Sequence, residues 1–404
     1  MSRALKAYLA ANAAFLIPGG LQTVLFPWLL VVVLAESPER VGLAQMLTQI
    51  PAVVLLLVAG LLGDRFDQRR ILIVTSVLVA ASPLAIAWLL AAHRLTFDNL
   101  IALAVFGSIV GVFSGPPRDA MLSRVAGERI QFTVILVLGL QFLSQIIGYG
   151  FALATDLVGG PLLFALAAAM YALGAWPCAL LPRGSVNDDE RAGGRAAPRH
   201  ALAEILAGLR EAAQSERLRP ALILTLALGS FFFGAFLVLL PLIVRDVYHG
   251  GASDISLVFG ANMIGTVIVI AVLMHRGGVV RQGRAFMLAL LFGCVLLSLL
   301  AVGPPRSMFL LLSFVWGLGG GFTLTMGRTI VQESAPPEMS ARLLSVYALC
   351  TSAGMPIGSL AIGYAAQRLG PLVAALLPAI GMATTVVLVG ATSRFWHLEA
   401  KHSA

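Results

Sequence analysis

The sequence predicts an all-α integral membrane protein of twelve transmembrane helices in two pseudo-symmetric six-helix halves. The 404-residue chain is 59% hydrophobic and only 11% charged, whereas an average soluble domain carries roughly 25% charged residues. So few charged side chains cannot cover a soluble surface, and the apolar content excludes an intrinsically disordered chain. Apolar runs near the length of about 20 residues that a spanning helix needs recur along the chain.

These runs fall into two groups of six. They cover residues 8–34, 41–62, 71–92, 99–117, 131–155, 161–181, 220–244, 255–274, 285–302, 308–331, 342–366 and 371–392. Turn residues separate them. We therefore expect an N-terminal half (1–181), a cytoplasmic linker with an amphipathic helix (182–219), a C-terminal half (220–392) and a cytoplasmic tail (393–404).

The distribution of basic residues predicts the orientation of the chain. Of the 27 Lys and Arg residues, 22 lie on the side of both termini, and five lie in the opposite loops: Arg40, Arg94, Arg245, Arg306 and Arg368. Because basic residues favour cytoplasmic loops, both termini are expected in the cytoplasm. The formal net charge of +8 then reflects membrane topology, and no nucleic-acid partner is expected.

The two halves also resemble each other in sequence. Arg118, which follows a Gly-Pro-Pro triplet, is echoed by Arg328, which follows Met-Gly. Parallel six-span repeats place a substrate path between the halves, near the middle of the bilayer. This favours a transporter with alternating access over a channel or an enzyme. No Walker-type glycine loop is present, and the cysteines have no metal-ligand spacing. We expect neither cofactor nor metal.

The loop after the second span carries a family resemblance. Residues 60–70 read Gly-Leu-Leu-Gly-Asp-Arg-Phe-Asp-Gln-Arg-Arg. This resembles the signature loop of the major facilitator superfamily, with matches at Gly60, Leu62, Asp64, Arg65 and Arg69. Asp67 stands where the general pattern has Gly, and Gln68 where it has Arg. The variant is similar to the drug:proton antiporter-3 branch, which includes macrolide efflux proteins and the enterobactin exporter, and weaker similarities cover most of the chain.

The resemblance implies the major facilitator fold and secondary active export of an amphipathic small molecule, drug-like or a siderophore, in exchange for protons. It also implies a monomer in a bacterial cytoplasmic (inner) membrane. Two departures stand out. The apolar body of the fourth span has no Arg, and the fifth span has no Gly-Pro pair at Gly148 to Phe151. Antiport is thus implied by the branch and not by that motif.

The signature loop is the predicted gate. Its residues are Gly60, Gly63, Asp64, Arg65, Arg69 and Arg70. One interpretation is a latch, in which a carboxylate is held by Arg side chains and a helix N-terminus. The other is a charged segment that only fixes topology.

Four charged residues are candidates for proton coupling. Arg118 with Asp119 lies at the cytoplasmic end of the fourth span, and Arg328 with Glu333 at that of the tenth. A buried carboxylate is easier to protonate near neutral pH, so Asp119 and Glu333 are the predicted proton carriers. The alternative is that all four are interfacial charges.

Uncharged polar and aromatic residues on the spans are the predicted substrate-binding set. They are Asn12, Thr23, Gln45, Gln49, Gln141, Gln145, Phe232, Asn262, Trp316 and Tyr347. Several spans carry no acid in their middle, which argues against a metal or small hydrophilic ion as cargo. The polar residues could instead bond neighbouring helices, and the aromatic ones could face lipid.

Two other functions remain open on the same fold. A lipid or lysophospholipid flippase would take its cargo sideways from one leaflet and depend weakly on a proton gradient. A nutrient uptake symporter would need paired fixed charges deep in the cavity, which the sequence lacks.

Overall fold

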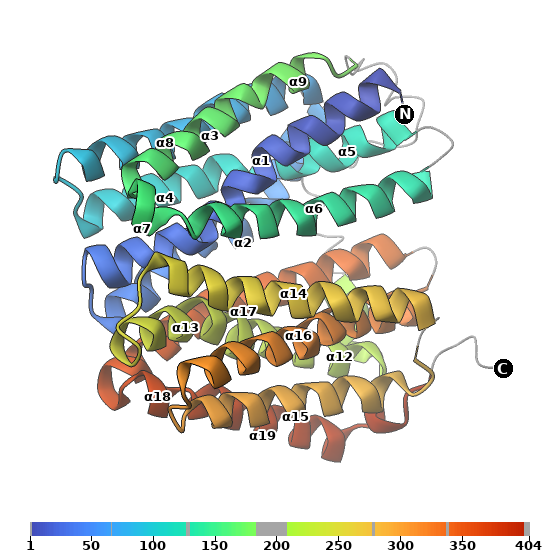
Figure 1. The fold of residues 1–404 in the computed structure, drawn as a ribbon. Helices are drawn as coiled ribbons and strands as arrows, with labels where there is room; N and C mark the ends of the chain where they lie inside the picture. The colour runs from blue at the N-terminus through green and yellow to red at the C-terminus, as the bar shows by residue number, and fades with distance from the viewer. Residues whose placement is uncertain are drawn as a thin grey trace. The chain divides into compact units, whose positions relative to one another are not determined.

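The computed structural model describes residues 2–65, 67–126, 130–182, 208–276, 279–336 and 339–399, with the side chains of 56–65, 130–131 and 340–341 left aside. Most of the predicted linker, with much of its amphipathic helix, lies outside these ranges. Within them every regular element is a helix (Figure 1). The all-α prediction is therefore confirmed.

The first half of the sequence begins with α1 (Arg3–Trp28), which continues as a π-helical stretch, Leu29–Val33. The next helices are α2 (Pro38–Arg65), α3 (Gln68–Ala91), α4 (Phe97–Val112), α5 (Gly115–Ala126), α6 (Ile130–Ala152), α7 (Thr155–Val158), α8 (Gly160–Leu173) and α9 (Ala175–Ala179). Two pairs of these helices join end to end, and each pair forms one membrane-capable segment: α4 with α5, and α8 with α9.

The second half begins with α12 (Leu218–Ala227), a π-helical stretch, Leu228–Phe233, and α13 (Gly234–Asp246). There follow α14 (Ala252–Arg276), α15 (Gln282–Leu300), α16 (Arg306–Ser334), α17 (Ser340–Leu369), α18 (Pro371–Ala374), α19 (Leu376–Thr392) and a 3-10 turn, Phe395–His397. Eleven helical segments among the described residues are long and apolar enough to cross a membrane. The partly described α2, 28 residues long, comes in addition.

The helix of the fourth span continues beyond the apolar run that ends at residue 117. α4 and α5 together form one 30-residue segment, Phe97–Ala126, that is long and apolar enough to cross a membrane. A short turn at Ser114 joins them, and Pro116 and Pro117 occupy the first turn of α5, where a missing N–H breaks no helical bond. Arg118 consequently lies in the second turn of a helix that continues to Ala126, and its predicted place at the cytoplasmic end of the span stays a prediction.

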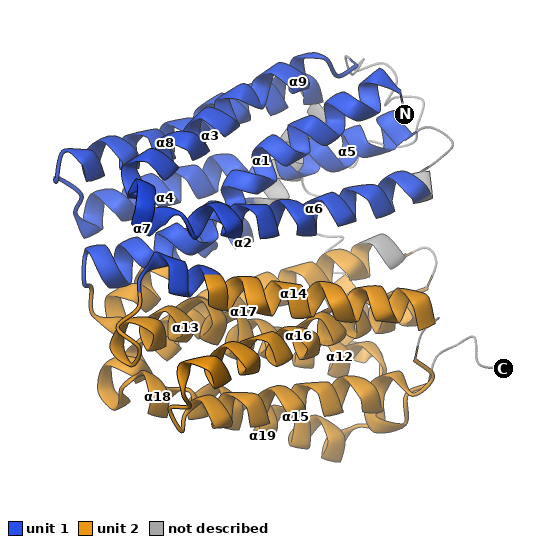
Figure 2. Ribbon diagram, in the orientation of Figure 1, with its two compact units in different colours: residues 1–35, 47–198, 251–256 blue, residues 36–46, 199–250, 257–404 orange. Residues whose placement is uncertain are grey.

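The chain forms two compact units (Figure 2). Unit 1 contains Met1–Ala35, Leu47–Pro198 and Gly251–Ser256, and unit 2 contains Glu36–Met46, Arg199–Gly250 and Leu257–Ala404. Each unit thus includes a short segment from the other half of the sequence. The predicted division at the linker follows sequence order only, and it stays a prediction.

Glycines bring helix backbones into contact inside each unit. In unit 1, a Cβ at Gly20 of α1 would lie 2.8 Å from the carbonyl oxygen of Gln145, and one at Gly148 of α6 would lie 2.6 Å from the backbone nitrogen of Leu21. In unit 2, a Cβ at Gly42 of α2 would lie 2.8 Å from the Cα of Gly363 on α17. Only glycine fits these crossings.

The α1–α6 crossing gives a matched test of this packing. Gly148→Ala places a methyl group against the backbone of α1, so we expect a loss of about 1–3 kcal/mol in stability, the usual cost of overpacking. Gly150 lies on the same helix with nothing within 4 Å of its Cβ direction. Gly150→Ala should leave the thermal midpoint in detergent unchanged or raised, because Ala favours helix over Gly. Equal losses in both variants would contradict the crossing.

Candidate functional site

The predicted gate lies where α2 ends and α3 begins. Gly60, Gly63, Asp64 and Arg65 belong to the last turns of α2, and their side chains lie outside the described residues. Asp67 caps α3, since its Oδ1 accepts a hydrogen bond from the backbone nitrogen of Arg69 at 3.0 Å. This capping role explains a carboxylate at a position where the family pattern has Gly.

The Arg70 side chain, 86% exposed, lies with its Nε 4.0 Å from Oδ2 of the same Asp67. An ion pair this exposed contributes little to stability. The latch interpretation of the whole loop stays a prediction.

Arg118 is the most constrained of the predicted coupling residues. Its guanidinium carbon lies 3.6 Å from the centroid of the Phe15 ring, and its Nη1 donates to Oδ1 of Asn12 at 3.4 Å. Asn12 in turn donates to the carbonyl of Tyr8 at 2.8 Å, and the Tyr8 hydroxyl donates to the carbonyl of Arg118 at 3.0 Å. These contacts close a ring between α1 and α5.

In the described part of the chain the Arg118 side chain forms no ion pair, and its buried Nε has no hydrogen-bond acceptor. Asp119, the next residue, is exposed. The close contacts of this guanidinium among the described residues are a cation–π contact and one amide oxygen.

The corresponding residues of unit 2 lie in a different environment. Arg328 is exposed, and Glu333 is half-buried and accepts a hydrogen bond from Nε2 of Gln282 at 3.1 Å. The repeated sequence pattern therefore does not give Arg118 and Arg328 equivalent surroundings.

A cavity of about 370 Å³ lies within unit 1, between α1, α2, α3, α4 and α8. Phe15, Phe26 and Phe164 supply aromatic walls, and uncharged polar groups come from Gln22, Thr23, Thr48, Ser82, Ser108 and Tyr171. None of the described residues that line it is charged. Such a mixture of aromatic surface and sparse hydrogen-bonding groups is typical of small-molecule sites.

Phe15 connects the cavity to Arg118. Its ring lines the cavity and meets the Tyr171 ring edge-on, with centroids 5.3 Å apart, while the Arg118 guanidinium lies over it. Nε2 of Gln22 donates to the Tyr171 hydroxyl at 3.1 Å. Cavity and cation therefore share one aromatic side chain and form one candidate site.

The predicted substrate-binding residues of unit 1 are not all at this site. Thr23 lines the cavity, with its hydroxyl bonded to the carbonyl of Gly19, and Asn12 holds Arg118 beside it. Gln49 is half-buried on α2. On α6, Gln141 is exposed and Gln145 donates to the Tyr149 hydroxyl at 3.2 Å.

In unit 2 the predicted residues join neighbouring helices. Asn262 donates to the carbonyl of Ser313 at 3.1 Å, and the Tyr347 hydroxyl to that of Leu324 at 3.2 Å. Gln45 is buried, with its Nε2 3.5 Å from the Leu237 carbonyl. For Asn262 and Tyr347 the structure thus shows the interhelical bonds that the sequence left as an alternative.

The predicted aromatic residues of unit 2 are packed inside it. Phe232 and Trp316 are 6% and 5% exposed, and their ring centroids lie 6.0 Å apart. Phe236 stacks on Phe259 at 4.3 Å. These rings form a core within unit 2.

Sequence reasoning missed Phe15, Gln22 and Tyr171. A signal existed for the first two, because Asn12, Phe15, Gly19 and Gln22 recur at three- and four-residue spacing along α1. Tyr171 stands in an alanine-rich run of α8, and nothing in the sequence marks it.

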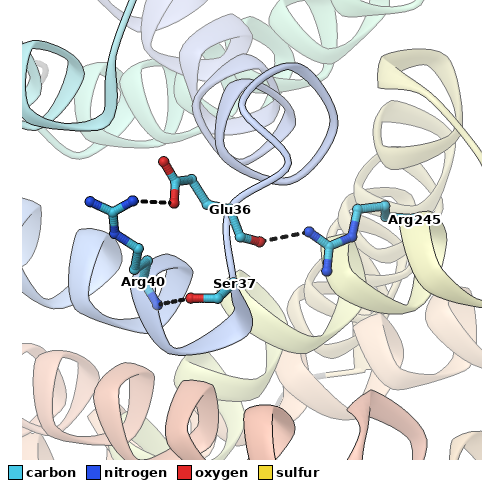
Figure 3. A network of polar contacts seen from close by, with 4 residues as sticks. All are labelled: Glu36, Ser37, Arg40 and Arg245. Atoms are coloured by element: carbon cyan, nitrogen blue, oxygen red, sulfur yellow. Dashed lines mark hydrogen bonds and ion pairs between the residues drawn. The ribbon is translucent and has the colours of Figure 1, made fainter.

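A polar network fixes the start of α2 within unit 2 (Figure 3). Nη1 of Arg245 donates to the Glu36 carbonyl at 2.8 Å, and Nη1 of Arg40 lies 2.7 Å from Oε2 of Glu36. Nearby, the Tyr248 hydroxyl donates to the carbonyl of Pro304, and burial raises the pKa of Tyr248. These contacts hold several loop ends of the unit together.

Multidrug efflux pumps from two mycobacterial species are similar to this chain in sequence. It is 24% identical over 366 residues to the multidrug efflux pump Tap of Mycolicibacterium fortuitum, covering 87% of this chain and 86% of that protein. It is 26% identical over 364 residues to the multidrug efflux pump Tap of Mycobacterium tuberculosis (strain ATCC 25618 / H37Rv), covering 85% and 82%.

Solved structures share the fold. The nucleoside transporter NupG superposes with a TM-score of 0.75 at 14% identity, covering 97% of this chain and 99% of that one. A POT family transporter in complex with 5-aminolevulinic acid gives 0.74 at 13% identity, covering 98% and 97%. The model of the Major Facilitator Superfamily matches residues 9–359. With the helical architecture above, these findings show that the chain belongs to the Major Facilitator Superfamily and is a non-enzymatic transporter.

Proposed function

We propose that this transporter exports an amphipathic small molecule in exchange for protons, by alternating access. The observation that carries the proposal is the cavity of unit 1, where aromatic walls and hydroxyl and amide groups coexist, and where no lining residue that the structure describes is charged. A flat, partly apolar molecule with a few hydrogen-bonding groups fits such a lining. A small hydrophilic ion would leave the aromatic walls of this lining unused.

The relatives support export as the direction. The Tap proteins are described as multidrug efflux pumps, and they match over more than four fifths of this chain. The loop from Gly60 to Arg70 then serves as the gate. The distribution of basic residues supports cytoplasmic termini, and a monomer in a bacterial inner membrane completes the proposal. Drug-like compounds and siderophores both remain cargo candidates within it.

Filling the cavity tests where the cargo binds. Gly111 lines the cavity and has nothing within 4 Å of its Cβ direction, so Gly111→Phe introduces a ring there without a backbone clash. We expect at least about a tenfold loss of transport in proteoliposomes supplied with a lipophilic dye, a macrolide, a catecholate siderophore and a lysophospholipid.

Gly150→Phe is the control, because Gly150 is exposed at the end of α6 with equal free space. Full transport by the Gly111 variant would show that the cargo binds outside this cavity. Movement of the lysophospholipid alone, without dependence on the gradient, would identify a flippase and reject the exporter.

Removing the candidate proton carriers tests the coupling. Asp119→Asn and Glu333→Gln keep the shape of each side chain but cannot bind and release a proton. We expect either variant to lose proton-driven accumulation at least about tenfold while still exchanging cargo across the membrane without a gradient, because exchange needs no net proton movement.

Asp98→Asn is the matched control, since Asp98 is an exposed acid in the first turn of α4. The measurement is labelled-cargo uptake with and without an imposed pH difference. Unchanged accumulation in both test variants would assign the coupling to other groups.

A further inference from the structure

We infer that the cargo is an aromatic organic acid and that Arg118 binds its carboxylate; this deepens the proposed function and rests on it. The apolar body of the molecule would lie in the cavity of unit 1 against Phe15. Its carboxylate would reach past the edge of that ring to the guanidinium.

The charge around Arg118 favours an anion. The guanidinium packs on the Phe15 ring with its Nε buried, and none of the described acidic residues forms an ion pair with it. A charge removed from water without a countercharge is destabilising, and the Phe15 ring face and the Asn12 oxygen compensate less than a carboxylate does. A bound anion would supply the close ion pair that Arg118 does not form with the described residues.

The hydrogen-bonding capacity of Arg118 also fits a carboxylate. Nη1 is directed to Asn12, and the buried Nε has no acceptor within the described residues. Guanidinium groups bind carboxylates through two parallel N–H bonds, and the Nε edge of the fork presents such a pair. An amide or alcohol would use these donors only in part.

The cavity selects the rest of the molecule. Phe15, Phe26 and Phe164 line it, and Gly107 and Gly111 leave room beside them. The space is about 370 Å³ and lies among five helices of one unit, which suits a compact ring system better than an acyl chain. We therefore assign the anion to a free aromatic acid and not to a lipid headgroup.

The test compares three ligands of the same shape: 2-naphthoic acid, its neutral amide and the cationic 2-naphthylmethylamine. Binding to the purified full-length protein in detergent is measured by equilibrium dialysis, with no gradient present. We expect the acid to bind at least about tenfold more tightly than the amide and the amine to bind most weakly.

Variants locate the source of that preference. Arg118→Gln should abolish the preference for the acid while leaving amide affinity within about twofold, which also reports an intact cavity. Arg124→Gln, on the same helix, is the control and should keep the preference. If Arg118→Gln loses amide binding as well, Arg118→Lys is tested instead. Lys keeps the positive charge but lacks the paired N–H donors of the guanidinium, so this variant should weaken acid binding more than amide binding.

Three results would overturn the inference: equal affinity for acid and amide in the unaltered protein, an acid preference that survives in the Arg118 variants, or binding of lysophosphatidic acid where naphthoic acid does not bind. The dialysis needs no transport. An acid preference in a protein that moves no cargo would therefore reject the proposed export and keep the anion-binding site. Transport of neutral cargo by a protein without an acid preference would keep the proposed export and reject the anion-binding site.

Discussion

Backbone contact between helices is the constraint on which the rest of this structure depends. Hydrophobic burial gives little drive for helices to associate within lipid, so close packing of small residues becomes important. At Gly20 and Gly148 the contact is so close that no side chain fits between α1 and α6. This crossing fixes the height and rotation of α1, and α1 carries Asn12, Phe15 and Gln22, which form much of the candidate site.

The placement of Arg118 follows from a second feature, the continuation of the fourth span through Ser114 into α5. Because the helix continues, the Arg118 side chain lies against α1, where Phe15 provides a flat apolar surface that suits a weakly hydrated planar cation. Phe15 therefore contacts the Arg118 guanidinium and also lines the cavity.

The sequence predicts the fold class well because lipid leaves the backbone few choices. Apolar runs of sufficient length must become helices whose own N–H and C=O groups are paired, and the positions of most spans follow directly. The continuation of the fourth span into α5 was not expected, because Arg118, Asp119 and Arg124 resemble a terminating charged segment. Only the tertiary partners Tyr8, Asn12 and Phe15 show that the Arg118 side chain packs against α1.

The candidate site was harder to predict. Helical periodicity indicates on which face of its own helix a residue lies, but not which residue of another helix that face contacts. Asn262 and Tyr347 have the same polar character as Thr23, yet they bond to carbonyl groups of adjacent helices. Phe232 and Trp316 pack against each other. Tyr171 lines the cavity because α8 packs beside α1 and α3. A single sequence does not show such contacts between distant segments.

The exchange of short segments between the two units has a consequence for the chain as a whole. Glu36–Met46 belongs to unit 2, and Gly251–Ser256 belongs to unit 1. A chain severed within 183–207 would give two fragments, each carrying a piece of its partner's fold and lacking a piece of its own. Two such halves produced together would each have to exchange these segments with the other to complete the two units.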